Sequence, residues 1–212
     1  MGPEREHPPE RARARAHAKE HVEEHVEEHV EEHVEEHAMS STPEPQSAPA
    51  SPAAEAAGDA AAESLQDRYA PQNRCFGCGP ANDKGLRIKS RVEGDELVAD
   101  FVPEEHHQAF AGMLNGGITG ALLDCHSNWA AAHHLMKARG EATPPCTVTA
   151  DFHVKLKRPT PLGPMRLRAR VAESEGDKVI VDATLEAGGK ITATCRGTFV
   201  AVKEGHPAYH RW

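Results

Sequence analysis

The feature that most constrains the fold is an apolar segment, residues 114–132, that begins with an asparagine and two glycines. Asn115 is a favourable N-cap residue, and Gly116 and Gly117 leave the first backbone N–H groups of a helix uncovered by any Cβ. Those N–H groups can reach a carbonyl oxygen of a bound molecule. Apolar residues recur at helical spacing, namely Ile118, Ala121, Leu122, Cys125, Trp129, Ala132 and Met136. The pattern predicts one central helix with an apolar stripe packed against a sheet.

Asp124 lies on the flank of that stripe, on the same edge of the helix as Gly117 and Asn128. A carboxylate, an amide and the glycine end of the helix therefore line up, and a reacting group could lie along this edge. Taken alone, so short a motif also fits a tight helix entry with a solvated aspartate, and such patterns more often mean this than a functional site.

Six other segments alternate apolar and polar residues, as expected for strands: 86–92, 96–102, 147–157, 165–171, 179–185 and 191–202. Glycine-containing turns separate several of them. The run at 147–157 is the longest, which predicts the central strand, with Val148, Ala150, Phe152, Val154 and Leu156 on one face. Two strands, a helix and four strands joined by short turns predict an α+β fold, in which an antiparallel sheet of about six strands wraps around one central helix.

The rest of the chain divides by composition. From His21 to His37 the unit His-Val-Glu-Glu repeats, which predicts a helix within residues 1–38, either a solvated extension or an engineered handle before Met39. Almost no large apolar residue occurs in the following Ser, Thr, Pro and Ala-rich stretch, so we expect disorder there. The expected units are a repeat helix at 1–38, a disordered linker at 39–70, a folded domain at 71–205 and a tail at 206–212.

Charge and cysteine content exclude several classes of protein. The formal charge of −9 argues against binding to nucleic acid or to an anionic membrane surface. The five cysteines form no disulfide framework, which indicates a reducing compartment. No apolar run is long enough to cross a bilayer, and the N-terminus lacks the apolar region of a signal peptide. We therefore expect a cytoplasmic protein with no membrane partner.

Cys75 and Cys78 form a Cys-x-x-Cys pair, a spacing at which two thiolates can bind one zinc ion. A structural zinc site needs four ligands, and no second pair of that kind follows, while Cys125 and Cys195 fall on apolar faces. A compact glycine turn is favoured over a metal site. We expect no metal and no cofactor.

The segment Cys75-Phe76-Gly77-Cys78-Gly79-Pro80, followed by Asn82 and Gly85-Leu86, resembles the opening of many hot-dog-fold acyl-CoA thioesterases of the PaaI type. Their central helix opens with His-Gly-Gly, and an Asp follows nine positions after the His. Asn115, Gly116, Gly117 and Asp124 match that spacing. The resemblance extends from about Asn73 to Val202 and implies the hot-dog fold.

The resemblance also implies roles for individual residues. The N–H of Gly116, with Gly117 nearby, would bind the thioester carbonyl, and Asp124 would act as nucleophile or general base. Thr149 matches a hydroxyl on the facing strand, and Gln108 matches a polar side chain shortly before the glycines. Asn115 stands where relatives usually have His, and because Asn cannot carry a proton, the protein should be slow or inactive if that His serves as an acid.

Three basic residues, Lys155, Lys157 and Arg158, end the longest strand and would suit the phosphates of coenzyme A, although a solvated strand face explains them equally well. The position of Cys125 on the apolar face favours packing over nucleophilic work. Histidines 126, 133 and 134 are interpreted as surface or interface residues and not as ligands.

The function that the resemblance implies is hydrolysis of an acyl-CoA thioester to a free acid and coenzyme A. The alternatives are a non-catalytic acyl-CoA-binding hot-dog domain and a hydratase or dehydratase of the same fold. In relatives the central strands of two subunits join, so we expect a homodimer, and possibly a homotetramer. Asp124 of one subunit would then face Gly116 of its partner.

Overall fold

The computed structural model describes residues 63–209, so the predicted repeat helix at 1–38 and most of the predicted linker lie outside the described residues. The elements in chain order are α2 (Leu65–Tyr69), β1 (Arg91–Glu93), β2 (Glu96–Phe101), the 3-10 turn η1 (Glu105–His107), β3 (Gln108–Phe110), β4 (Met113–Leu114), α3 (Gly116–Arg139), β5 (Thr147–Leu156), β6 (Met165–Glu175), β7 (Lys178–Ala187) and β8 (Lys190–Ala201).

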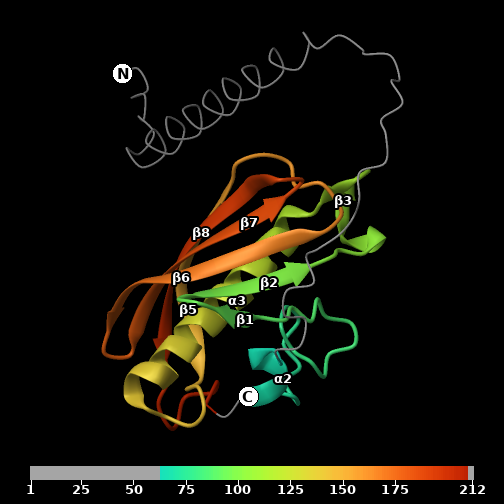
Figure 1. The fold of residues 1–212 in the computed structure, drawn as a ribbon. Coiled ribbons are helices and arrows are strands. Elements are labelled where there is room, and N and C mark those ends of the chain that lie inside the picture. Colours follow the sequence, from blue (N-terminus) through green and yellow to red (C-terminus); the bar gives the residue numbers. More distant parts are fainter. Residues whose placement is uncertain (1–62, 210–212) are drawn as a thin grey trace, which may run out of the picture. The chain divides into compact units, whose positions relative to one another are not determined.

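Six of the strands form one antiparallel sheet in the order β1-β2-β6-β7-β8-β5. The sheet curls around α3, which runs across its inner face (Figure 1). The short strands β3 and β4 form a separate hairpin just before α3. This arrangement confirms the predicted α+β hot-dog fold, with one central helix inside a six-stranded antiparallel sheet.

The helix α3 begins as its sequence predicts. Asn115 is the N-cap, and its side-chain oxygen accepts hydrogen bonds from the N–H groups of Gly117 at 2.8 Å and Ile118 at 3.3 Å. The helix ends before Gly140, which adopts a left-handed φ of 65° that suits glycine. Removing the cap should weaken the helix entry that positions the glycines.

We predict that Asn115→Ala lowers the free energy of unfolding by about 1 kcal/mol, because two N–H groups at the helix entry lose their acceptor. Asn115→Asp is the matched control, since its carboxylate can still accept both hydrogen bonds. Thermal denaturation of the two variants checks the prediction, and equal melting temperatures for Asn115→Ala and the unchanged protein would contradict it.

The burial of α3 differs from the single apolar stripe that the sequence predicts. From Leu122 to Met136 the helix is buried around most of its circumference, and buried positions include the polar residues His126, Ser127 and Asn128. The sheet covers one side, and the chain before β1 covers another, with Leu86 and Ile88 in the same core cluster as the helix. A helix enclosed in this way does not need a polar face.

His126 is not a surface residue, as the sequence suggested, but is fully buried. Its Nε2–H donates to the carbonyl oxygen of Leu97 at 3.0 Å, so Nδ1 is left to accept from the hydroxyl of Ser90 at 2.9 Å. Ser90 is in turn hydrogen-bonded to the buried side chain of Gln66. His126 therefore links α3 to β2 and to the chain around α2, and burial lowers the pKa of His126 to about 4.

This buried histidine predicts a loss of stability in acid. Between pH about 6.5 and about 4 the unfolded chain binds a proton at His126 that the folded chain does not, so stability falls as pH falls through this window, by up to about 3 kcal/mol. His126→Gln retains a neutral polar side chain and should show a flatter dependence. Chemical denaturation of both proteins at pH 7 and pH 4.5 measures the difference, and equal pH slopes would exclude His126 as the source.

The strand β5 lies at the edge of the sheet and not at its centre, which corrects the prediction from its length. Its pairing with β8 shifts register between Thr149 and Asp151, so the strand bulges at Ala150. The bulge reverses the alternation of faces. Thr149 contacts α3 before the bulge, and Phe152, Val154 and Leu156 line a groove against α3 after it.

The first predicted strand, 86–92, is mostly irregular, and only Arg91–Glu93 pairs as β1. The preceding residues bond instead to the loop that carries Cys75 and Cys78. The N–H of Leu86 donates to the carbonyl oxygen of Phe76, and the N–H of Ile88 donates to that of Gly77. Arg87 between them has a φ of 54°. These bonds hold the loop against the domain.

Composition placed the start of the folded domain at residue 71, but the described fold already includes the residues around α2. Ser64 caps α2, and Ser64, Leu65 and Gln66 are all buried. The hydrogen bonds from Gln66 to Ser90 explain the difference, because they depend on a contact that local composition cannot reveal.

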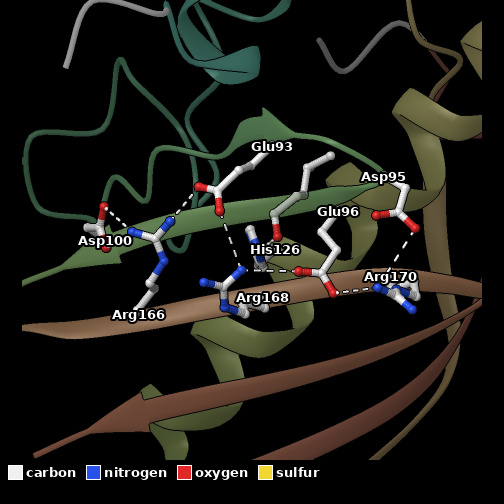
Figure 2. A network of polar contacts seen from close by, with 9 residues as sticks. Glu93, Asp95, Glu96, Asp100, His126, Arg166, Arg168 and Arg170 are labelled. Atoms are coloured by element: carbon white, nitrogen blue, oxygen red, sulfur yellow. Dashed lines mark hydrogen bonds and ion pairs between the residues drawn. The ribbon is translucent and has the colours of Figure 1, made fainter. Parts of the chain in front are cut away.

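A network of ion pairs joins β1 and β2 to β6 (Figure 2). Three arginines of β6 meet four carboxylates across the strands: Arg166 with Glu93 and Asp100, Arg168 with Glu93 and Glu96, and Arg170 with Asp95 and Glu96. Most of these side chains are solvent-accessible, so each pair contributes about 1 kcal/mol or less.

Within residues 63–209, none of the helices combines the length and the apolar character that crossing a membrane requires.

Candidate functional site

Asp124 lies on α3, where it faces the start of β5. The hydroxyl of Thr149 donates a hydrogen bond of 2.7 Å to its Oδ1. Thr149 reaches α3 because the bulge at Ala150 places it on the inner face of β5. Asp124 is partly exposed and lines two cavities, so its carboxylate is oriented by a neighbour and still accessible to a ligand.

The larger of these two cavities is a groove of about 420 Å³ between α3 and β5. Its walls are glycine, alanine and apolar side chains: Gly116, Gly117, Gly120 and Ala121 from the helix, and Phe152, Val154 and Leu156 from the strand. Phe152 and Leu156 remain 38% and 58% exposed, so much of the apolar wall is open. The groove combines an apolar surface with a carboxylate at Asp124 and the helix N-terminus at Gly116.

The two glycines of the helix entry differ in what their N–H groups bind. The N–H of Gly117 donates to the side chain of Asn115, whereas no hydrogen bond from the N–H of Gly116 is found among the described residues. A Cβ on Gly116 would lie 3.2 Å from Leu156 Cδ1, so the backbone here borders the groove closely. Gly116 is therefore the member of the pair whose N–H can bind a ligand oxygen.

Gly116 and Asp124 of one chain are too far apart to act directly on one carbonyl group. They are separated by eight residues of helix, which corresponds to about 12 Å along the axis. A carbonyl oxygen hydrogen-bonded to Gly116 N–H would leave its carbon beyond direct attack by Asp124 of the same chain.

Two other predictions find less support in the geometry. The side-chain oxygen of Gln108 accepts from the N–H of Gly112, and Gln108 lines neither cavity that contains Asp124. Lys155 pairs with Thr194 and lines a cavity on the outer face of the sheet, away from Asp124. Lys157 and Arg158 follow β5, where both backbone N–H groups donate to Thr192, and their side chains are exposed.

The second cavity at Asp124 contains residues that the sequence did not connect with it. It has a volume of about 330 Å³ and is lined by Asn73, Cys75, Cys78, Asp124, Cys125, Asn128 and Thr149. The sulfur atoms of Cys75 and Cys125 lie 3.7 Å apart. Hydrogen bonds with Cys125 and then Cys78 hold the pKa of the Cys75 thiol far below its ordinary value. Hydrogen bonds with Cys75 and then Cys78, together with burial, raise the pKa of Cys125. The one feature of the sequence that could have connected the cysteines with this cavity is that Cys125 directly follows Asp124.

No protein-family model matches the sequence, and no curated protein matches it. Solved structures do match. A thioesterase superfamily protein is 22% identical, covers 85% of this chain and 81% of its own, and has a TM-score of 0.52. A putative thioesterase from Ralstonia eutropha JMP134, described as phenylacetic acid degradation-related, is 24% identical over 59% of this chain and 92% of its own, with a TM-score of 0.50.

A thioesterase superfamily protein from Shewanella loihica PV-4 is 27% identical, covers 58% of this chain and 98% of its own, and has a TM-score of 0.48. The two structures with TM-scores of 0.52 and 0.50 establish the fold of this chain. The chain has the hot-dog fold of thioesterase superfamily proteins, in agreement with the resemblance noted in its sequence.

Proposed function

We propose that this protein is a thioester hydrolase that converts acyl-CoA to a free acid and coenzyme A. The observation that carries the proposal is the position of Asp124, oriented by Thr149 at an apolar groove whose other end holds the N–H of Gly116. An acyl chain fits the apolar walls, and a thioester carbonyl fits a backbone donor at a helix N-terminus.

In the proposed reaction, the N–H of Gly116 stabilises the negative charge that develops on the carbonyl oxygen, an effect typically worth about 10²–10³ in rate. Asp124 attacks the carbonyl carbon or removes a proton from the attacking water. The thiolate of coenzyme A then leaves. Where Asp124 is the nucleophile, the acyl group remains on its carboxylate as an anhydride, which water hydrolyses to the free acid. Because a thiol has a pKa of about 8.5, a thiolate departs without help from a general acid, so Asn115 in place of His is compatible with turnover.

The proposed active unit is a homodimer. β5 is an edge strand ten residues long, and such an edge is normally covered or paired. In the proposed dimer the β5 edges of two chains pair, and Gly116 of one chain lies near Asp124 of the other. The two residues could then act on one carbonyl group, which they are too far apart to do within a single chain. Sedimentation analysis of the full chain distinguishes this dimer from a monomer, and from a tetramer built of two such dimers.

Residues following β5 are proposed to contact the phosphates of coenzyme A. Lys157 and Arg158 are exposed and lie just beyond Leu156, which lines the groove, whereas Lys155 faces the outer surface of the sheet.

We also propose that the protein is located in the cytoplasm. All five of its cysteines are free thiols, which suits a reducing compartment.

The test is release of free thiol from a panel of acyl-CoA esters of increasing chain length. Saturable hydrolysis with a preferred chain length would support the proposal. Tight binding of acyl-CoA without thiol release would instead indicate the non-catalytic binding domain. Loss of enoyl-CoA absorbance without thiol release would indicate a hydratase.

A further inference from the structure

Three cysteine side chains converge beside Asp124, although they come from two distant parts of the sequence. Cys75 and Cys78 belong to the loop before β1, and Cys125 belongs to α3. Their sulfur atoms all lie within 4.8 Å of one another. Cys78 and Cys125 are buried and Cys75 is partly exposed, so the cluster sits at the inner wall of the 330 Å³ cavity.

The spacing of the sulfur atoms suits a metal ion better than a disulfide. In a tetrahedral zinc site with Zn–S bonds of about 2.3 Å, neighbouring sulfur atoms are about 3.8 Å apart. Cys75 and Cys125 are separated by 3.7 Å. A disulfide would need the two sulfur atoms at about 2.05 Å and would leave the third thiol without a covalent partner.

Glycines in the loop make this convergence possible. A Cβ on Gly77 would lie 2.4 Å from Cys125 Sγ, so a larger residue would push the loop away from α3. A Cβ on Gly79 would lie 2.5 Å from Asn73 O and Cys75 N, so the tight fold that brings Cys78 back towards Cys75 also needs glycine.

We propose that Cys75, Cys78 and Cys125 form a binding site for Zn²⁺ or a similarly soft divalent cation, with the fourth coordination position open to the cavity that Asp124 lines. Three thiolates select such ions over Mg²⁺ and Ca²⁺, which prefer oxygen ligands. The ion would tie the loop before β1 to the central helix. This inference concerns metal binding and does not depend on the proposed hydrolysis.

Cobalt binding to the full chain, kept reduced with a phosphine, tests the site. Co²⁺ bound by thiolates gives an intense sulfur-to-cobalt absorption, and histidines in the His-Val-Glu-Glu repeats cannot produce it because they contribute no sulfur. We expect this band to saturate at one Co²⁺ per chain and to disappear when Zn²⁺ is added. Cys146→Ser, which changes a buried cysteine outside the cluster, should keep the band, whereas Cys75→Ser should lose most of it.

Absence of the band in the unchanged protein would overturn the proposal, and so would an undiminished band in Cys75→Ser. Circular dichroism establishes that each variant is folded. If Cys75→Ser does not fold, Cys125→Ala replaces it and is held to the same criterion. As a second readout, Zn²⁺ should raise the melting temperature of the unchanged protein and of Cys146→Ser, but not that of the cluster variants.

Discussion

Asp124→Ala is expected to lower the rate of thioester hydrolysis by about 10²–10⁴-fold, because the proposed nucleophile or base is removed while the groove remains. The melting temperature should change little, since Asp124 is partly exposed and lies outside the apolar core cluster. Initial rates of thiol release, measured on the best substrate of the panel, give the result directly.

Two further variants separate chemistry from structure. Asp124→Asn keeps an oxygen that can accept the hydrogen bond from Thr149, yet it cannot serve as nucleophile or base, so it should be as inactive as Asp124→Ala. Asp95→Ala removes a carboxylate that is 82% exposed and pairs with Arg170, and it should leave the rate unchanged. Near-normal hydrolysis by purified Asp124→Ala would refute the assigned role.

Features that depend on local sequence were predictable. The N-cap at Asn115 was confirmed because Asn followed by two glycines determines a helix entry within a few residues. The strands after α3 were confirmed because period-two alternation is a local property, and their ends differ from the predicted ones by at most four residues. The hot-dog arrangement then followed from the order of these elements.

Features that depend on contacts between distant segments were not predictable. The edge position of β5 and the bulge at Ala150 arise from pairing with β8, so the alternation in the sequence did not reveal that Thr149 shares the inner face of β5 with Phe152. The burial of His126 requires Ser90 and Leu97, which lie 36 and 29 residues away. Likewise, Cys125 joins the loop cysteines only because the chain before β1 folds onto α3.

The separation of Gly116 and Asp124 along α3 leads to a second strong prediction, which concerns a site shared between subunits. Gly116→Pro should remove the proposed donor without disturbing the helix, because proline is tolerated at the first helical position. The preceding residue, Asn115, already has φ −64° and ψ 134°, the conformation that proline requires before it. Gly116→Ala is the matched control, because it keeps the N–H and adds only a methyl group near Leu156.

Asp124→Ala and Gly116→Pro should each be inactive alone but active when co-expressed. In a mixed dimer, the first chain supplies an intact Gly116 and the second an intact Asp124, so one of the two shared sites is complete. Random pairing makes half of the dimers mixed, and the mixture should therefore recover about a quarter of the original activity, as expected for a two-fold symmetric dimer. Native mass spectrometry establishes that mixed dimers form. If they form and the mixture is no more active than either parent, Asp124 and Gly116 do not act across the subunit interface.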